Sequence, residues 1–253
     1  MSTEGKVAVI TGATGGIGFA VAKRLGQDGY TVILNGIDDE AGAERIKELT
    51  AEGITAEYLG FDVTNEEAVT KNIKAIGEKY GKIDTLINNA GGLGGRSRFE
   101  EMTTEFYRGV MALNLDSAFF ASRAAIPYLK KGDHPSIINY TSNAGWTAGG
   151  PGAGIYGTSK AGVHALTRAL AKDLAEYGIR ANAVSPGTID TPFHAQIKAT
   201  KPEVFASWAN NIMLGRLGQP EDVAGVVSFL ASKDAAFITA ETVQIGGGQA
   251  LGI

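Results

Sequence analysis

The stretch TGATGGIG, Thr11–Gly18, holds four glycines in eight residues near the start of the chain. It follows the β-branched run KVAVI and opens an apolar-periodic segment, so it lies where a strand passes into a helix. Glycine is unfavourable inside either element, because it loses more backbone entropy on folding than other residues. At such a junction, however, free backbone N–H groups and the positive end of the helix dipole suit a pyrophosphate. The alternative is a tight turn that needs glycine for its own geometry, since G-x3-G-x-G differs from the commoner G-x-G-x-x-G.

Short β-branched runs alternate with longer amphipathic segments along the chain. The predicted strands are Lys6–Thr11, Tyr30–Asn35, Thr55–Phe61, Ile83–Asn88, Ser136–Ser142 and Ile179–Ser185, with a last one near residue 243. The predicted helices span residues 17–28, 40–52, 65–80, 104–130, 156–177 and 220–232. Repeated strand–helix alternation indicates an α/β fold, a single Rossmann-type, doubly wound parallel sheet of about seven strands with helices on both faces.

Capping residues support these boundaries. Asn65 followed by two glutamates is typical of a helix start. Glycines follow four of the predicted helices, at Gly29, Gly53, Gly81 and Gly178. Because the chain shows no linker or repeat, we expect residues 1–253 to form a single dinucleotide-binding and catalytic domain. An irregular insertion around residues 187–219 is expected to form part of the substrate site.

Composition excludes several classes of function. With a net charge of −4 the chain has no basic patch, so nucleic-acid binding is not expected. The absence of cysteine excludes disulfides and thiolate zinc sites, and three scattered histidines make a metal site improbable. The N-terminal MSTEGK lacks the features of a secretory signal, and no apolar run is long enough for a membrane span. We therefore expect a soluble cytoplasmic protein without metal or membrane contacts.

Further motifs fall at the ends of the predicted strands or open the helices that follow. In chain order they are NNAG at Asn88–Gly91, Asn114, Ser142, Tyr156-x-x-x-Lys160 and Pro186-Gly187. Each of these polar residues alone is more often a cap or a surface residue. Together with TGATGGIG, and in this order, the set resembles the short-chain dehydrogenase/reductase family over nearly the whole chain. The carboxyl edge of an open α/β sheet, where these motifs gather, is where such folds bind ligands.

Four residues are the candidate catalytic groups. Tyr156 and Lys160 are four apart on a predicted helix, so they share one face. A nearby ammonium stabilises a phenolate, so we expect Lys160 to lower the pKa of Tyr156, the general acid and base. Ser142 is expected to hold the substrate oxygen through a hydrogen bond. The resemblance implies that Lys160 also binds the nicotinamide ribose and that Asn114 holds a water that relays protons to Lys160.

The resemblance also implies which residues bind the cofactor. They are Gly12, Thr14, Gly15, Gly16, Ile17, Gly18, Gly36, Ile37, Asp38, Asp62, Val63, Asn89, Ala90, Gly91, Tyr156, Lys160, Pro186, Gly187, Thr188, Ile189 and Thr191. NAD enzymes of this family usually carry Asp at the position of Gly36. NADP enzymes usually carry Arg or Lys at the position of Ile37 or Gly15. This chain has neither, and negative charge at Asp38 favours NAD(H), with NADP(H) still possible and helix capping the alternative role for Asp38.

The substrate is expected to be a small keto acid or keto sugar. The candidate contacts are Gly92, Arg96, Ser142, Asn143, Ala144, Trp146, Tyr156 and His194. Arginine binds carboxylates well, although Arg96 is equally consistent with a solvated loop cation. The loops are similar to those of bacterial reductases that convert 4-deoxy-5-hexoseulose uronate, from alginate, to 2-keto-3-deoxygluconate. A gluconate 5-dehydrogenase-like enzyme and a 3-oxoacyl-carrier-protein reductase are the nearest alternatives.

An alternative of another class is a non-catalytic dinucleotide-binding regulator on the same scaffold. Intact Asn114, Ser142, Tyr156 and Lys160 argue against it, because a sensor needs none of them; the fold alone does not decide the matter. The resemblance further implies a homotetramer that pairs the helices around residues 104–130 and 156–177 and the C-terminal strand.

Overall fold

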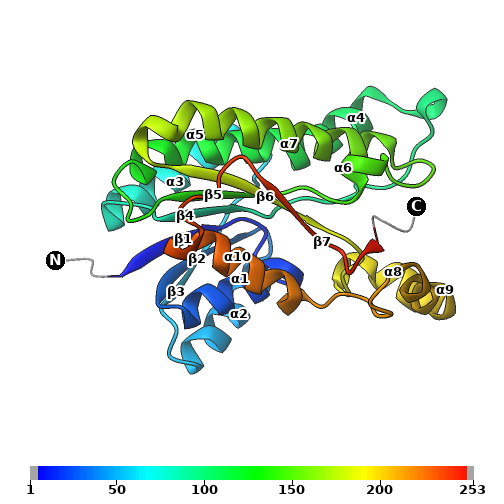
Figure 1. The fold of residues 1–253 in the computed structure, drawn as a ribbon, viewed down its shortest axis with the longest axis horizontal. Coiled ribbons are helices and arrows are strands. Elements are labelled where there is room, and N and C mark those ends of the chain that lie inside the picture. Colours follow the sequence, from blue (N-terminus) through cyan, green and yellow to red (C-terminus); the bar gives the residue numbers. More distant parts are fainter. Residues whose placement is uncertain (1–4, 250–253) are drawn as a thin grey trace.

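Seven parallel strands form one sheet in the computed structural model, which describes residues 5–249 (Figure 1). The strands are β1 (Lys6–Ile10), β2 (Tyr30–Gly36), β3 (Ala56–Gly60), β4 (Thr85–Asn88), β5 (Ser136–Tyr140), β6 (Arg180–Pro186) and β7 (Thr242–Ile245). Their order is β3-β2-β1-β4-β5-β6-β7, and every neighbouring pair is parallel. The order reverses between β1 and β4, so this is the doubly wound α/β fold that the sequence predicts.

Helices cover both faces of the sheet (Figure 1). On one face lie α1 (Gly16–Gln27), α2 (Asp39–Ala51) and α10 (Pro220–Ala231). On the other lie α3 (Glu66–Tyr80), α5 (Ser117–Leu129) and α7 (Gly154–Leu174). Within residues 5–249, no helix is long and apolar enough to span a membrane.

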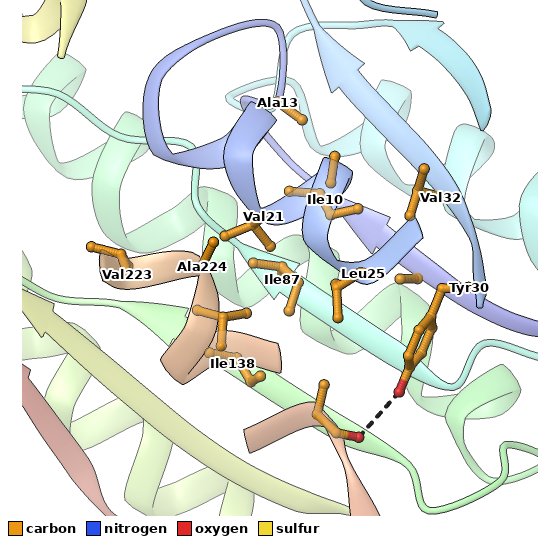
Figure 2. Packing of buried hydrophobic residues seen from close by; sticks show 14 of the residues in the cluster. Ile10, Ala13, Val21, Leu25, Tyr30, Val32, Ile87, Ile138, Val223 and Ala224 are labelled. Carbon is orange, nitrogen blue, oxygen red and sulfur yellow. Dashed lines mark hydrogen bonds between the residues drawn. The ribbon is translucent and has the colours of Figure 1, made fainter. Parts of the chain in front are cut away.

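Successive residues of the central strands point into two separate cores. In β1, Ala8 and Ile10 pack towards α1 and α10, whereas Val7 and Val9 pack towards α3 and α5. Figure 2 shows the first core, in which the hydroxyl of Tyr30 donates a hydrogen bond to the carbonyl of Ala231, 3.2 Å away. This bond ties the start of β2 to the last residue of α10. Two buried faces explain why the strands read as continuous apolar runs rather than as alternating ones.

The predicted helix boundaries are confirmed at their caps. The Asn65 side chain accepts a hydrogen bond from the Ala68 backbone N–H, which starts α3. Gly81 ends the same helix in the left-handed conformation, with φ of 77° and its N–H bonded to Gly77 O. The other three predicted stop glycines also have positive φ and follow helical segments. Local capping chemistry was therefore a reliable guide to where helices begin and end.

The predicted helix 104–130 is helical from Thr104 to Leu129, but it is not one regular α-helix. It consists of α4 (Thr104–Met111), a π-helical turn (Ala112–Asp116) and α5, which also accommodates Pro127. The π turn inserts one extra residue per turn and changes which side chains point inward. Such turns frequently occur at functional sites, and this one carries Asn114.

The segment 187–219, predicted as irregular, contains two short helices. They are α8 (Ala195–Thr200) and α9 (Pro202–Ser207), flanked by the 3-10 turns Pro192–His194 and Trp208–Asn211. A further short helix, α6 (Ala144–Thr147), follows β5. Helices of four to six residues span too few turns to give a hydrophobic period, which is why the sequence pattern missed them. In Figure 1, α8 and α9 project beyond the end of the sheet.

Candidate active site

A cavity of about 430 Å³ opens at the carboxyl ends of β1, β4, β5 and β6. It brings together six parts of the chain: the glycine-rich loop, the segment after β4, the end of β5, the start of α7, the segment after β6 and Gln249. Its lining residues are Gly12, Gly15, Gly16, Ile17, Gly18, Asn89, Gly91, Tyr140, Thr141, Ser142, Asn143, Tyr156, Lys160, Pro186, Gly187, Thr188, Ile189, Thr191, Pro192, Phe193, His194 and Gln249.

Two glycines of the loop are required by the protein's own packing. A Cβ atom at Gly12 would lie 2.9 Å from Ala90 Cα, and Gly12 has a φ of 62°. A Cβ atom at Gly18 would lie 2.5 Å from Asn89 Nδ2. These glycines make room for the Asn89–Ala90 segment rather than directly for a ligand. The turn geometry considered as an alternative therefore accounts for part of the glycine pattern.

Gly15 is different, because it faces open space. A Cβ atom there would have no neighbour within 4 Å, and its φ of −173° is extended backbone that any residue adopts. It is also the N-cap of α1 and has no side chain to bond the free N–H groups of the first turn. Free N–H groups at the positive end of a twelve-residue helix, beside a cavity, fit the pyrophosphate of a dinucleotide.

Asn89 braces this loop from the neighbouring strand. Its side-chain Nδ2 donates hydrogen bonds to Thr11 O (2.9 Å) and Gly12 O (2.8 Å). The Thr11 hydroxyl in turn accepts from the backbone N–H groups of Asn89 and Ala90, both at 3.1 Å. The first Asn of NNAG, Asn88, instead points into the sheet and bonds Asn139 at 2.8 Å. Thr11 thus helps to build the site, although the sequence analysis did not include it among the candidate cofactor-binding residues.

Asn114 is tied to the loop after NNAG. Its Nδ2 donates to Gly92 O (2.8 Å) and Val110 O (2.9 Å), and its Oδ1 accepts from Gly92 N (3.0 Å). A Cβ atom at Gly91 would lie 2.8 Å from Asn114 Oδ1 and 2.9 Å from Lys160 Nζ. Gly91 therefore allows both polar groups to approach the same point, which is the juxtaposition that a proton relay between them requires.

Lys160 is buried at the centre of the site. Its Nζ donates a hydrogen bond to the carbonyl of Tyr140 at 2.9 Å. Burial disfavours the charged form and lowers the pKa of Lys160 to about 8. A lysine whose pKa lies this close to neutrality can exchange a proton readily, which suits a relay.

The buried ammonium of Lys160 should lower stability near neutral pH. Between about 8 and 10.5, its folded and usual pKa values, the unfolded chain binds more protons than the native chain, so native stability rises with pH. Replacing Lys160 with methionine removes this dependence. The stability advantage of the variant over the wild type should therefore fall by roughly 2–3 kcal/mol from pH 7 to pH 10.

Denaturant unfolding at several pH values measures this difference. The exposed Lys172 lies on the same helix, and its replacement by methionine serves as the control that should show no such trend. A difference between Lys160→Met and the wild type that is constant with pH would contradict the burial argument.

Tyr156 and Ser142 both line the cavity. The nearby Ser142 hydroxyl acts to lower the pKa of the Tyr156 phenol, but burial has the larger effect and raises that pKa. This is opposite to the direction expected from Lys160. The reason is geometric, because Lys160 Nζ lies 5.9 Å from the centre of the Tyr156 ring and bonds Tyr140 O instead. The phenol is therefore protonated at neutral pH, as a proton donor must be, but its raised pKa makes it a weaker acid than a free tyrosine.

The predicted substrate residues divide into two groups. Ser142, Asn143, Tyr156 and His194 line the cavity, whereas Gly92, Arg96, Ala144 and Trp146 are not among its lining residues. Arg96 is exposed and donates to Pro151 O at 2.8 Å, which joins two glycine-rich loops outside the cavity. Trp146 is 50% exposed and packs against the His164 ring at an interplanar angle of 57°, with ring centroids 4.4 Å apart. The arginine is thus engaged with the backbone rather than directed at the site.

His194 is held by aromatic rings. The rings of Phe193, Trp208 and Phe205 lie 5.0, 5.3 and 5.5 Å from it, centroid to centroid. Burial lowers the pKa of His194, although Asp190 opposes the shift. A neutral, fixed imidazole at the cavity wall offers one donor and one acceptor to a polar substrate.

The residues predicted to contact the adenosine half lie apart from this cavity. Ile37 is 81% exposed, and Asp38 accepts a hydrogen bond from Ala41 N (3.0 Å) as the N-cap of α2. Asp62 accepts from Thr64 N and from the Thr64 hydroxyl, both at 2.8 Å. A Cβ atom at Gly36 would lie 2.5 Å from Thr14 Cγ2. Asp38 therefore does cap a helix, while keeping its charge at the surface beside Ile37.

Gln249 lines the cavity but was not predicted. Its amide bonds Thr188 and Asn143. The only signal in the sequence was its position after three successive glycines. Because Gln249 lies in no predicted helix or strand, its sequence context did not show where its side chain would point. Within residues 5–249 no three metal-ligating side chains gather into a cluster.

Comparison with known proteins places this site in a family. A family model described as Enoyl-(Acyl carrier protein) reductase matches residues 12–250. The chain belongs to the short-chain dehydrogenase/reductase family. The sequence resemblance is thereby confirmed at the level of this family, but not at the level of the uronate reductases.

Several short-chain dehydrogenases/reductases match along their whole length. The chain is 38% identical over 250 residues to 3-oxoacyl-[acyl-carrier-protein] reductase FabG of Thermotoga maritima, covering 98% of this chain and 99% of that protein. It is 37% identical over 255 residues to diacetyl reductase [(S)-acetoin forming] of Staphylococcus aureus, covering 97% and 98%.

Solved structures of the family agree with the fold. A variant of actinorhodin polyketide ketoreductase with NADPH superposes with a TM-score of 0.92 at 32% identity, covering 98% of each chain. Ligand-free aldohexose dehydrogenase of Thermoplasma acidophilum gives a TM-score of 0.87 at 34% identity, covering 98% of this chain and 95% of the other. The chain is therefore an NAD(P)-type oxidoreductase by family, and the names of these relatives refer to several different substrates.

Proposed function

We propose that this protein is a carbonyl reductase and alcohol dehydrogenase in which Tyr156 is the proton donor and acceptor. A bound nicotinamide supplies or accepts the hydride at carbon. Ser142 holds the substrate oxygen, the Tyr156 phenol gives it a proton, and Lys160 with Asn114 replaces that proton from the interior. The observation that carries the proposal is the meeting of Ser142, Tyr156 and Lys160 on one cavity beside the α1 N-terminus.

NADH is the proposed cofactor, and we expect NADPH to bind more weakly. A 2′-phosphate needs a cation, and neither Gly15 nor Ile37 provides one. Asp38 is exposed at the start of α2 and would repel the phosphate. Gly15, Ile37 and Asp38 thus favour NAD(H), which lacks the 2′-phosphate, over NADP(H).

The proposed substrate is a small hydroxylated carbonyl compound, with a keto-sugar acid such as 4-deoxy-5-hexoseulose uronate as the specific candidate. Hydroxyl, amide and imidazole groups of Asn143, Thr188, His194 and Gln249 line the cavity beside Ser142. Groups that both donate and accept hydrogen bonds suit sugar hydroxyls better than an acyl chain. Similarity to an aldohexose dehydrogenase supports this class, and the engagement of Arg96 with Pro151 O leaves carboxylate recognition as the weaker part of the proposal.

The FabG relatives favour a second candidate, a 3-oxoacyl-carrier-protein reductase. The chain's net charge of −4 would repel an acidic carrier protein, which places this candidate second. We further propose a cytoplasmic homotetramer of single-domain subunits. Its contacts would use α5, α7 and the edge strand β7. On α5, Phe119 is 41% exposed.

A substrate panel tests these proposals. NADH oxidation should be measured with keto-sugar acids, diacetyl and a 3-oxoacyl thioester, and NAD⁺ reduction should be measured with gluconate. We expect kcat/KM to be highest for a hydroxylated keto acid and lower for the thioester. Preference for the thioester would transfer the assignment to the second candidate. No turnover on any member, together with tight NADH binding, would favour the regulator instead.

A further inference from the structure

The side-chain amide of Gln249 links two walls of the cavity. Its Oε1 accepts hydrogen bonds from the Thr188 backbone N–H at 2.9 Å and from Asn143 Nδ2 at 3.2 Å. Its Nε2 donates to the Thr188 hydroxyl at 2.9 Å. Asn143 follows the candidate catalytic Ser142, whereas Thr188 belongs to the cavity segment after β6. One residue near the end of the chain therefore joins segments more than 40 positions apart.

Two glycines shape the niche that holds this amide. A Cβ atom at Gly187 would lie 2.6 Å from Gln249 Oε1 and 2.8 Å from Gly246 Cα. A Cβ atom at Gly246 would lie 3.5 Å from Asn143 Nδ2. Neither glycine has a positive φ, so neither is required by its own backbone conformation. Gly187 must be small because the Gln249 amide and the Gly246 backbone occupy the space beside it, whereas a Cβ atom at Gly246 would make only ordinary contacts.

The hydrogen bonds of Gln249 affect the candidate catalytic groups through Asn143, which is the next residue after Ser142. The Asn143 backbone N–H also donates to Pro186 O at 3.2 Å, which forms a second bridge between the same two walls. Ser142, one residue earlier, lines the same cavity as Tyr156 and is close enough to influence the pKa of its phenol. A change in the separation of the walls would therefore move Ser142 relative to Tyr156 and to the segment Pro186–Thr188.

We infer that Gln249 is a positioning residue, which fixes the Ser142–Asn143 wall against the Pro186–Thr188 wall so that substrate oxygen and cofactor meet at the reactive distance. The inference rests on the proposed function for its kinetic consequence only. Misplacement of reacting groups by about 1 Å can lower a rate by up to about 100-fold. A displacement of this size, caused by the loss of the Gln249 amide, would therefore lower kcat enough to be measured.

The test compares a methionine with a glutamate at this position. The donors to Oε1 are two N–H groups and, at 3.3 Å, the Thr188 hydroxyl. A carboxylate can accept from all three, whereas the methionine thioether is only a weak acceptor. We expect Gln249→Met to lower kcat about tenfold or more at saturating NADH. Gln249→Glu should stay within about threefold of the wild type on a neutral diketone such as diacetyl. Gln244 lies exposed on β7, and Gln244→Met is the matched control that should leave kcat unchanged.

Hydrogen exchange of the peptide around Thr188 gives a readout that needs no turnover. The Thr188 N–H should exchange faster in Gln249→Met and at the wild-type rate in Gln249→Glu, with NADH binding retained in both. Wild-type exchange and kcat in Gln249→Met, or equal losses of kcat in the two variants, would overturn the inference. If the wild type reduces no carbonyl, the proposed function fails, and the exchange rates still decide whether Gln249 holds the two walls.

Discussion

Replacing Tyr156 with phenylalanine is expected to lower kcat by roughly 10²–10⁴-fold, the usual contribution of a positioned acid or base. The change removes one oxygen and leaves the ring, so packing at the start of α7 is preserved. Ser142 keeps its place on the cavity wall, where it can still bind the substrate oxygen. NADH binding should therefore persist, and the loss should appear in kcat rather than in cofactor affinity. Steady-state NADH oxidation and direct NADH titration measure the two quantities separately.

The pH profile identifies the group responsible. Burial raises the pKa of Tyr156, so the phenol carries its proton at neutral pH and supports reduction there. Oxidation of an alcohol needs the phenolate, and its rate should rise with pH as the phenol begins to ionise. Tyr156→Phe should abolish this rise. Tyr107→Phe, at a residue 42% exposed on α4, is the control and should change neither direction. Equal turnover in Tyr156→Phe and the wild type would remove Tyr156 from the mechanism.

The sequence predicted the sheet and most helices because their signals are local. β-branched runs marked the strands, and Asn65 and Gly81 marked the ends of one helix through chemistry that lies within a few residues. The π turn around Asn114 could not be foreseen, because an extra residue in a helical turn leaves no distinct pattern. What stabilises it is tertiary, since Asn114 bonds Gly92 across the loop.

The sequence predicted which residues form the candidate site better than it predicted how they interact. The motif order led to Ser142, Tyr156 and Lys160, and the fold brings all three to one cavity. The expected pKa shift of Tyr156 was wrong in direction, because it depends on burial and on where Lys160 Nζ points. Gln249 was missed for a related reason: its partners lie 61 and 106 positions away, beyond any local pattern.

Changing Gly15 to arginine is expected to shift cofactor preference towards NADPH. The ratio of kcat/KM for NADPH to that for NADH should rise roughly 10- to 100-fold, since a charge-assisted hydrogen bond contributes about 1.5–3 kcal/mol. The backbone permits the change, because φ is extended and no atom lies within 4 Å of the new Cβ. Initial rates with both cofactors on one substrate provide the measurement. Gly15→Met, of similar length but uncharged, should leave the ratio unchanged.

Gly36 offers a matched experiment with the opposite expectation. The aspartate common in NAD enzymes of the family would place its Cβ 2.5 Å from Thr14 Cγ2, so Gly36→Asp alone should displace Thr14 and weaken NADH binding. Combining it with Thr14→Ala removes the obstructing methyl group and should recover NADH affinity. A wild type that already prefers NADPH, or a Gly15→Arg ratio within about twofold of the wild type, would contradict the assignment. A side chain fits at Gly15 without any rearrangement, whereas one at Gly36 would collide with Thr14. We therefore expect one added positive charge at position 15 to change cofactor preference without a change in the shape of the loop.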